Sequence, residues 1–131
     1  MREIKFRAWL KESNQMIQND FVNKEASSFV IYDEVAQEWI SNEAEFILMQ
    51  FTGLKDRNGK EIYEGDICHI GTRATEQEEA TDEGNTEIWF HEGKFLTRYY
   101  AFPVSAWACK EICFIEVIGN IYENPELLKE A

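Results

Sequence analysis

Three cysteines and two histidines are the residues of this sequence best suited to hold a metal ion. Structural zinc is usually held by two close pairs of ligands, with two to four residues inside a cysteine pair. The spacing of Cys109 and Cys113 fits, but Cys68 and His69 are adjacent and rarely reach one ion together. In extended chain, Cys109 and Cys113 stand roughly 13 Å apart at ~3.3 Å per residue, too far for zinc bonds of about 2.3 Å. Cys109, Cys113 and His91 could be metal ligands only if the segment 108–113 were helical or turned. We interpret the cysteines as ordinary buried or half-buried residues and therefore predict no metal and no cofactor.

The same residues are the candidates for a nucleophile and its base. Such a pair must meet in space. Cys68 and His69 alternate on a predicted strand, so they face opposite sides and do not activate each other. Cys68 or Cys113 with His91 stays open, but no motif supports it. We therefore predict no catalytic residue and keep an unrecognised enzyme or metal protein as the third hypothesis.

Carboxylates crowd the middle of the chain at Asp56, Glu61, Glu64 and Asp66, where they could imitate an acid–base or cation site. Asp56 and Asp66 neighbour glycine or asparagine, and such aspartates bond nearby backbone N–H groups and stabilise turns. This structural interpretation is the simpler one. The glycines of the segment lack the Gly-Lys-Ser/Thr sequence of a phosphate-binding loop.

A second acidic group occupies a polar segment that we expect to be a loop at 71–86. Its carboxylates are Glu76, Glu78, Glu79, Asp82 and Glu83. A solvated loop is the default, because dense like charges repel one another. The alternatives are a surface that binds a basic partner and mimicry of DNA charge.

The formal charge of −12, from 25 acidic and 13 basic residues, argues against general nucleic-acid binding, which depends on Lys and Arg. Residues 1–24 are the exception, with five basic against three acidic residues. A local patch of Arg2, Lys5, Arg7 and Lys11 therefore makes nucleic-acid association the second hypothesis. The aromatic residues are expected in the core, not as a base-stacking platform; those concerned are Trp39, Trp89, Tyr99, Tyr100 and Trp107.

Charges near the start interrupt any signal peptide, and the apolar runs are far shorter than the ~20 residues of a membrane helix. Three sparse cysteines suit a reducing cytoplasm. We therefore predict a cytoplasmic protein without a membrane partner. At 131 residues the chain fits a single domain.

Strands dominate the elements that would position these residues. Alternation at 3–9 predicts a strand with one buried face, and strands are also expected at 16–22, 29–32 and 46–51. Residues 33–40 are ambiguous between strand and helical turn. Asn58-Gly59 predicts a tight type I′ hairpin in which both residues have positive φ, and Gly53 and Gly65 mark two further bends.

The second half of the chain follows the same pattern. Strands are expected at 67–70, 87–91, 94–102 and 112–118, with Glu92-Gly93 as a turn, Pro103 as a strand end, and Gly119-Asn120 as a break. Asn124 and Pro125 predict the start of a short C-terminal helix.

Three blocks together carry a family resemblance: MREIKFRAW at 1–9, MQFTGLKDRNGKEIYEGDI at 49–67 and VIGNIYENPELL at 117–128. In this order and spacing they closely resemble the YopX-like proteins of bacteriophages and prophages. The resemblance implies a phage or prophage origin, a cytoplasmic setting and a β-rich fold, and it brings no catalytic residue or cofactor. The signature residues are Gly53, Asp56, Asn58, Gly59, Gly65, Asp66, Gly119, Asn120 and Pro125.

The segment from Glu64 to Ile67 is also similar to the opening of small SH3-like barrels. We expect a mainly β fold of one YopX-like domain: an N-terminal β segment at 1–48, then an SH3-like barrel at 49–131 that ends in the short helix. The first functional hypothesis is a non-catalytic accessory protein that binds another protein or itself.

Overall fold

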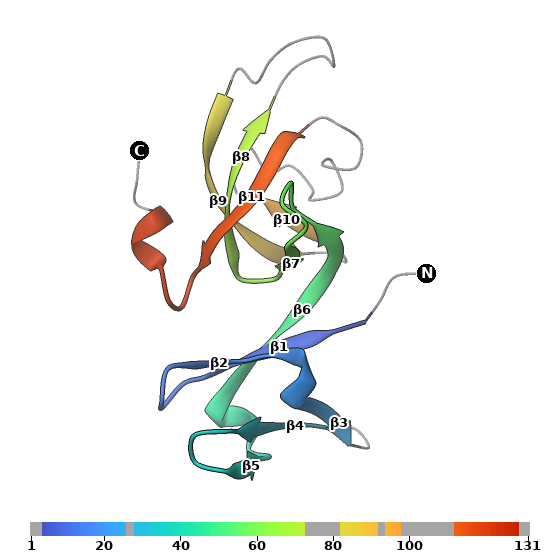
Figure 1. Cartoon of the computed structure of the whole chain (residues 1–131), viewed down its shortest axis with the longest axis vertical. Coiled ribbons are helices and arrows are strands. Elements are labelled where there is room, and N and C mark those ends of the chain that lie inside the picture. Colours follow the sequence, from blue (N-terminus) through green and yellow to red (C-terminus); the bar gives the residue numbers. More distant parts are fainter. Residues whose placement is uncertain (1–3, 26–27, 73–81, 92–93, 98–111, 129–131) are drawn as a thin grey trace. The chain divides into compact units, whose positions relative to one another are not determined.

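The computed structural model describes residues 4–25, 28–72, 82–91, 94–97 and 112–128 (Figure 1). These residues form a mainly β protein, and none of them belongs to a helix of seven residues or more. The strands are β1 (Phe6–Leu10), β2 (Gln15–Ile17), β3 (Val22–Glu25), β4 (Ser28–Asp33), β5 (Glu38–Ile40), β6 (Phe46–Lys55), β7 (Glu61–Tyr63), β8 (Asp66–Thr72), β9 (Asp82–His91), β10 (Lys94–Thr97) and β11 (Ile112–Asn120). Short 3-10 turns are η1 (Asn19–Phe21), η2 (Glu43–Glu45) and η4 (Pro125–Leu128). No helix in this described part is long and apolar enough to cross a membrane.

The strands form three sheets, with the orders β2-β1-β6-β7, β3-β4-β5 and β10-β9-β8-β11. The chain divides into two compact units, residues 1–51 (unit 1) and 52–131 (unit 2). The boundary falls inside β6, the longest strand of the first sheet, so this strand contributes to both units.

The core of unit 1 lies between β2-β1-β6 and β3-β4-β5. Its buried side chains are Ala8, Leu10, Ile17, Ile31 and Phe46. The expectation that β1 buries only one face is wrong, because Arg7 and Trp9 are buried on the other side of Ala8. β1 is the central strand between β2 and β6, which leaves it no open edge.

Two local features set the strand boundaries in unit 1. The predicted strand at 16–22 is two strands, because η1 follows β2 and separates it from β3. The ambiguous segment at 33–40 is a hairpin: Asp33 Oδ1 accepts hydrogen bonds from Val35 N at 3.0 Å and Ala36 N at 3.1 Å, and Gln37 turns the chain with φ 58°. The buried carboxylate thus holds the turn between β4 and β5.

The core of unit 2 lies on one face of the sheet around β8. Cys68 and Ile70 point into it together with Ile62, Ile88 and Ile115, and all five are fully buried. β8 pairs with both β9 and β11, so it is a central strand. His69, between Cys68 and Ile70, points to the opposite face, as alternation on a strand requires.

The turn between β6 and β7 differs from the predicted type I′. Gly59 has φ 83°, but Asn58 is not among the residues with positive φ. Gly59 N bonds to Asp56 O at 3.0 Å and Asp56 N to Lys60 O at 2.8 Å, the pattern of a three-residue loop with a left-handed glycine. Asp56 causes the difference, because its Oδ1 accepts from Asn58 N and Lys60 N inside the loop. Gly53 and Gly65 have the predicted positive φ, 90° and 86°.

The acidic segment is less of a loop than predicted. β8 continues to Thr72 and β9 begins at Asp82, with Thr72 opposite Asp82 and Gly71 opposite Glu83. Backbone pairing in this hairpin outweighs the polar composition of the segment. Residues 73–81, with Glu76, Glu78 and Glu79, lie outside the described part.

The C-terminal elements also differ from expectation. β11 continues through Gly119 to Asn120, with a register irregularity between Val117 and Gly119 in place of a break. The predicted C-terminal helix is the four-residue 3-10 turn η4, which begins at Pro125. Asn124 Oδ1 accepts a hydrogen bond from Asn120 N at 3.3 Å, so this side chain stabilises the bend that precedes η4. Glu92, Gly93 and the predicted strand beyond Thr97 lie outside the described residues.

Candidate functional site

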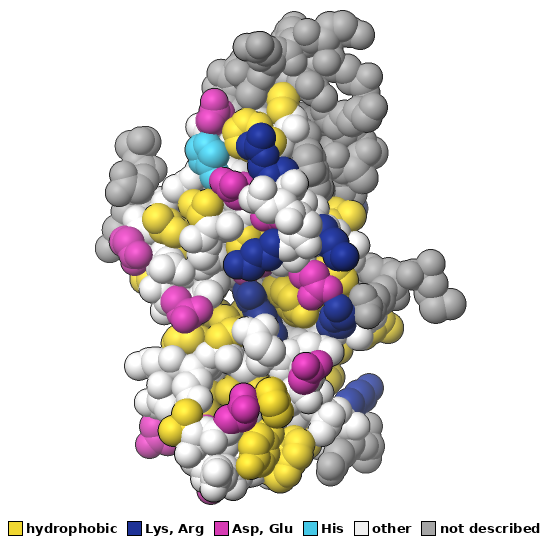
Figure 2. Space-filling view, viewed as in Figure 1, with side chains coloured by type: hydrophobic (Ala, Val, Ile, Leu, Met, Phe, Trp, Pro, Cys, Tyr) yellow, Lys and Arg dark blue, Asp and Glu magenta, His cyan; other side chains and the backbone are white. Residues whose placement is uncertain are grey.

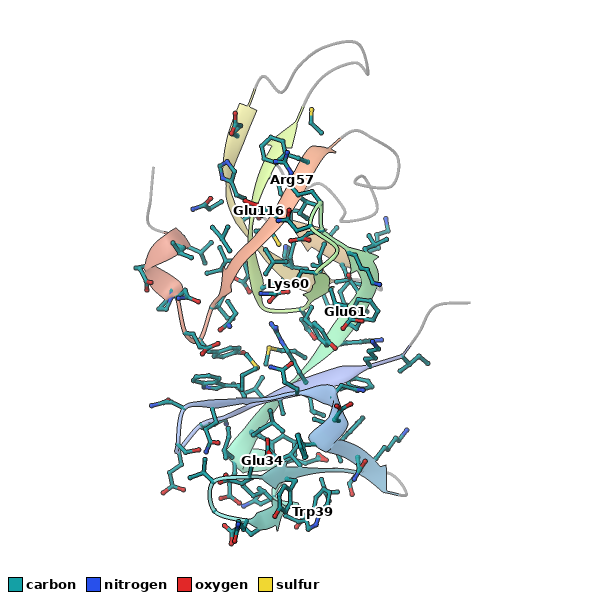
Figure 3. The ribbon with its side chains drawn as sticks, in the orientation of Figure 1. Glu34, Trp39, Arg57, Lys60, Glu61 and Glu116 are labelled. Carbon is teal, nitrogen blue, oxygen red and sulfur yellow. The ribbon has the colours of Figure 1, made fainter. Side chains whose placement is uncertain are left out.

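The first candidate site is the outer face of the sheet β9-β8-β11 in unit 2. We call it the His69 face and define it by His69 (β8), Glu83 and Asn85 (β9), Phe114 and Glu116 (β11), and Arg57 from the turn before β7. Asn85 and Glu116 lie directly opposite His69 on the two neighbouring strands. The face joins residues from four parts of the sequence: strand register aligns three of them, and the backbone hydrogen bond from Arg57 N to Ile115 O at 2.9 Å brings in the turn. In Figure 3, Arg57 and Glu116 are labelled in this region.

Both ring nitrogens of His69 face hydrogen-bond acceptors. Nδ1 lies 2.8 Å from Asn85 Oδ1, and Nε2 lies 3.0 Å from Glu83 Oε1. The orientation of the Asn85 amide follows from its other end, because Nδ2 donates to Leu127 O at 2.9 Å. Both nitrogens are satisfied together only when each carries a proton. The geometry therefore favours the imidazolium form of His69.

The electrostatics agree with this assignment. Burial lowers the pKa of His69, but the hydrogen bonds to Asn85 and Glu83 and the charges of Glu83 and Glu116 raise it more, so the pKa lies above its ordinary value. An imidazolium has no lone pair for a metal ion or for a substrate proton. His69 thus connects strands and is poorly placed to act as a base.

Aromatic and cationic side chains complete the His69 face. The ring of Phe114 lies 5.6 Å from that of His69, and the guanidinium of Arg57 lies 4.9 Å above Phe114. Asn58 Nδ2 donates to Glu116 Oε2 at 3.0 Å. These contacts attach the turn between β6 and β7 to β11, which is a structural role.

Asp56 supports this attachment from below the surface. Its Oδ2 accepts from Val117 N of β11 at 2.9 Å, while Oδ1 accepts from Asn58 N and Lys60 N at 2.8 and 2.9 Å. Burial raises the pKa of Asp56, but these three backbone hydrogen bonds and the charge of Lys60 lower it more, so it lies below the ordinary value. Asp66, also buried, accepts from Tyr63 N at 2.7 Å. Both carboxylates therefore stabilise backbone, as the structural interpretation of the central block predicts.

The second candidate site is an aromatic surface in unit 1. We call it the Trp39 face and define it by Phe21 (η1), Tyr32 (β4) and Trp39 (β5). Tyr32 and Trp39 are cross-strand partners whose rings meet edge to face at 5.0 Å, and the rings of Phe21 and Tyr32 are 6.1 Å apart. Trp39 is 55% exposed, so the expectation of a core tryptophan is wrong here. The reason is its position on β5, the last strand of its sheet.

The surroundings of the Trp39 face are apolar and acidic. Val35, in the turn that joins β4 and β5, is 80% exposed, and Glu34 and Glu38 beside it are exposed as well. Figure 2 shows hydrophobic side chains gathered over β4 and β5 near the lower end of the view, next to acidic ones. Figure 3 labels Glu34 and Trp39 on this hairpin.

The predicted N-terminal basic patch is described in part. Arg2 lies outside the described residues, and Arg7 is buried, with 8% of its surface exposed. Lys5 Nζ lies 5.5 Å above the ring of Phe51, and Lys11 Nζ donates to Ala44 O at 3.0 Å. Of the three described cations of the patch, Arg7 is therefore the one that its burial removes from an open surface.

The other predicted site residues are only partly visible. Cys113 is half-buried on β11, whereas Cys109 and the side chain of His91 lie outside the described part of the chain. The residues that the structure describes contain no cluster of three His, Cys, Asp or Glu arranged for a metal ion. Of the acidic group, Asp82 begins β9 and Glu83 binds His69. Tyr99, Tyr100 and Trp107 are also not described, and Trp89 is half-buried on β9.

Sequence reasoning did not find either face as a unit. The His69 face depends on pairing across residues 73–81, and composition does not give that register. Alternation did place His69 opposite to Cys68. For the Trp39 face, a usable signal was the run from 28 to 45, where Trp39 lies among carboxylates with no Lys or Arg.

Comparisons with known proteins give a family and a fold. A sequence model of the YopX protein family matches residues 5–129. The crystal structure of protein EF1440 from Enterococcus faecalis matches with 28% sequence identity and a TM-score of 0.64, and the match covers 98% of this chain and 99% of the EF1440 chain. The crystal structure of protein yopX from Bacillus subtilis is 23% identical, with coverage of 98% and 99% and a TM-score of 0.63. No curated protein matches the chain.

Proposed function

The chain belongs to the YopX protein family, and from this premise we propose that it is an accessory protein that binds another protein without catalysing a reaction. We further propose that it is encoded by a phage or prophage and acts in the bacterial cytoplasm. The family resemblance of its three sequence blocks supports this setting, as does the sparse use of cysteine.

The exposed Trp39 face carries the proposal. Tryptophan and tyrosine dominate the residues whose truncation most weakens protein interfaces, because they bury a large area at little entropic cost. A tryptophan that is 55% exposed, in contact with Tyr32 and on the same hairpin as the exposed Val35, has the composition of such an interface. The polar groups of the His69 face contact one another, which agrees with a structural role for that face.

Unit 2 supports a finer description of the fold, an SH3-like barrel. Gly65, with φ 86°, precedes Asp66 at the start of β8, and Gly65 N and O bond to Ile88 O and Ile121 N. The antiparallel order β10-β9-β8-β11 that follows is compatible with a small barrel. Such a barrel would be a scaffold and would carry no activity by itself.

Nucleic-acid binding is the alternative, and it has less support. Arg7 is buried and Lys11 is held by Ala44 O, so the predicted patch offers few accessible cations. A mobility-shift assay at low salt checks it: a shift that weakens as salt rises would favour the alternative.

Affinity capture from lysogenic or infected cells tests the main proposal. The tagged chain, its Trp39→Ala variant and its Phe90→Ala variant are compared by crosslinking and quantitative mass spectrometry. Phe90 is a matched control, because it is 46% exposed and meets Phe95 edge to face at 5.0 Å. We expect a stoichiometric partner that Trp39→Ala loses and Phe90→Ala retains. Equal capture by all three proteins, or no partner together with a measurable turnover, would contradict the proposal.

A further inference from the structure

We infer that the Trp39 face takes a lysine- or arginine-rich segment of the partner protein. The inference rests on the proposed function and adds the chemistry of the partner. It comes from two independent properties of the β4–β5 hairpin, an accessible indole ring and a charge of one sign around it.

The charge of the hairpin is uniformly negative. Residues 28–45 contain no Lys or Arg, and their carboxylates are Asp33, Glu34, Glu38, Glu43 and Glu45. Asp33 is buried and used by the turn, whereas the other four side chains are exposed. A surface with one sign of charge attracts a partner of the opposite sign and repels phosphate backbones.

The cations that the structure describes in unit 1 lie elsewhere than beside Glu34 and Glu38. Lys5 lies over Phe51, Arg7 is buried, and Lys11 reaches Ala44 in η2, beyond the far end of β5. Lys24 lies on β3, at the opposite edge of the sheet from β5. The hairpin itself therefore carries two exposed carboxylates and no positive charge.

The indole supplies the second attraction. A cation above an aromatic face within about 6 Å is attracted by the ring quadrupole, and tryptophan is the strongest such ring. The ring of Trp39 meets that of Tyr32 edge to face, and Trp39 is still 55% exposed. An Arg or Lys side chain lying on this ring would also be attracted at longer range by the exposed carboxylates of the same hairpin, Glu34 in the turn and Glu38 on the other face of β5.

The surface is also preformed. Asp33 fixes the turn through two backbone hydrogen bonds, and the β4–β5 register holds Tyr32 against Trp39. A preformed surface binds an extended basic segment with less ordering cost. Such a segment could also bring apolar side chains to Val35, which is 80% exposed.

The test uses the full chain and fluorescein-labelled peptides. Three peptides of equal length are compared, one with alternating Arg and Lys among Gly and Ser, one with Glu in place of the cations, and one uncharged. Binding is followed by anisotropy at low and high salt. The variants are Trp39→Ala and the pair Glu34→Gln with Glu38→Gln. The controls are Phe90→Ala and the pair Glu123→Gln with Glu126→Gln, exposed carboxylates of unit 2.

We expect the cationic peptide alone to bind, with an affinity that falls about tenfold or more between low and high salt. Trp39→Ala should weaken binding by about fivefold or more, and the Glu34/Glu38 pair should remove most of the salt dependence. The control variants should bind as the wild type does. This set of results supports the inference.

Other results overturn it and separate it from the proposed function. Equal binding of the uncharged or acidic peptide means that the partner chemistry is wrong. If no peptide binds but Trp39-dependent capture from cells persists, the inference fails and the proposed function stands. If neither peptide binding nor Trp39-dependent capture is observed, the inference and the proposed function both fail. Self-association in analytical ultracentrifugation that Trp39→Ala abolishes would make a second copy the occupant, through cations such as Lys55, Arg57 and Lys60, and would also overturn the inference.

Discussion

Replacing Asp56 with alanine removes one carboxylate that accepts three backbone hydrogen bonds. Two of them hold the loop between β6 and β7, and the third, from Val117 N, joins that loop to β11. Asn58 and Lys60 are exposed, so water can replace the carboxylate at their N–H groups. Val117 is half-buried and its N–H would lose its partner in the middle of the strand. The main cost therefore lies at Val117.

The magnitude follows from these environments. A hydrogen bond to a charged group contributes about 1.5–3 kcal/mol, and a donor left without a partner costs about 1–3 kcal/mol. We expect Asp56→Ala to lower the free energy of unfolding by about 3 kcal/mol. Asp56→Asn retains one acceptor oxygen but turns an N–H₂ group toward a backbone N–H, so about 2 kcal/mol is expected. Asp20→Ala, at an exposed aspartate, should stay within about 0.5 kcal/mol.

Urea unfolding at pH 7, followed by far-ultraviolet circular dichroism, measures these differences. The pH dependence gives a second check. Because the pKa of Asp56 in the folded protein lies below the ordinary value of 3.8, its contribution is complete above that pH and is lost as the pH falls through the lower folded value. The gap between wild type and Asp56→Ala should therefore narrow below about pH 4. A loss no larger than that of Asp20→Ala, or a gap that widens in acid, would refute this account of Asp56.

Three further predictions concern unit 2. A Cβ at Gly119 would lie 2.5 Å from Asn124 Oδ1, so Gly119→Ala should lower the free energy of unfolding, measured by thermal unfolding, by about 1–3 kcal/mol. Adding Asn124→Ala should recover part of this loss; strictly additive losses of the two substitutions would contradict the clash. Gly59 has open space around its Cα but a φ of 83°, so Gly59→Ala should lower the free energy of unfolding in urea by about 1–2 kcal/mol and Gly59→Asn by less. Equal losses for the two variants would argue against backbone strain as the cause. Because the pKa of His69 is raised in the folded protein, its contribution to stability is complete below pH 6.5 and is lost as the pH rises through the pKa of the folded state. The difference in unfolding free energy between the wild type and His69→Gln should therefore shrink between pH 6 and 9. An NMR titration should show a lower His69 pKa in Glu83→Gln, and an unchanged pKa would exclude the Glu83 contact.

Local sequence determined much of the fold because local chemistry acts there. The positive φ angles of Gly53, Gly59 and Gly65 follow from what glycine permits, and Asp56 and Asp66 bind backbone as aspartates near turns do. The predicted type of the Asn58-Gly59 turn was wrong because the side chain of Asp56, two residues before Asn58, accepts from the N–H groups of Asn58 and Lys60. Type I′ statistics do not include that competition.

The sequence did not predict which strands become neighbours in the sheets. The bond between His69 and Glu83 depends on the register of β8 with β9, and the exposure of Trp39 depends on β5 being an edge strand. Both are set by packing of the whole unit. Arg7 shows the same effect, since alternation predicted an outward cation, whereas Arg7 and Trp9 on that face of β1 are both buried.

The link between Asp56 and Val117 has a consequence for synthesis of the chain on the ribosome. The two residues are 61 positions apart, and β8 of the same unit pairs with β11. Until residues 112–120 leave the ribosomal tunnel, the loop before β7 lacks its anchor and one edge of β8 is uncovered. Unit 2 can therefore complete its fold only after residues 112–120 have emerged, whereas the strands of unit 1 emerge first and pair among themselves.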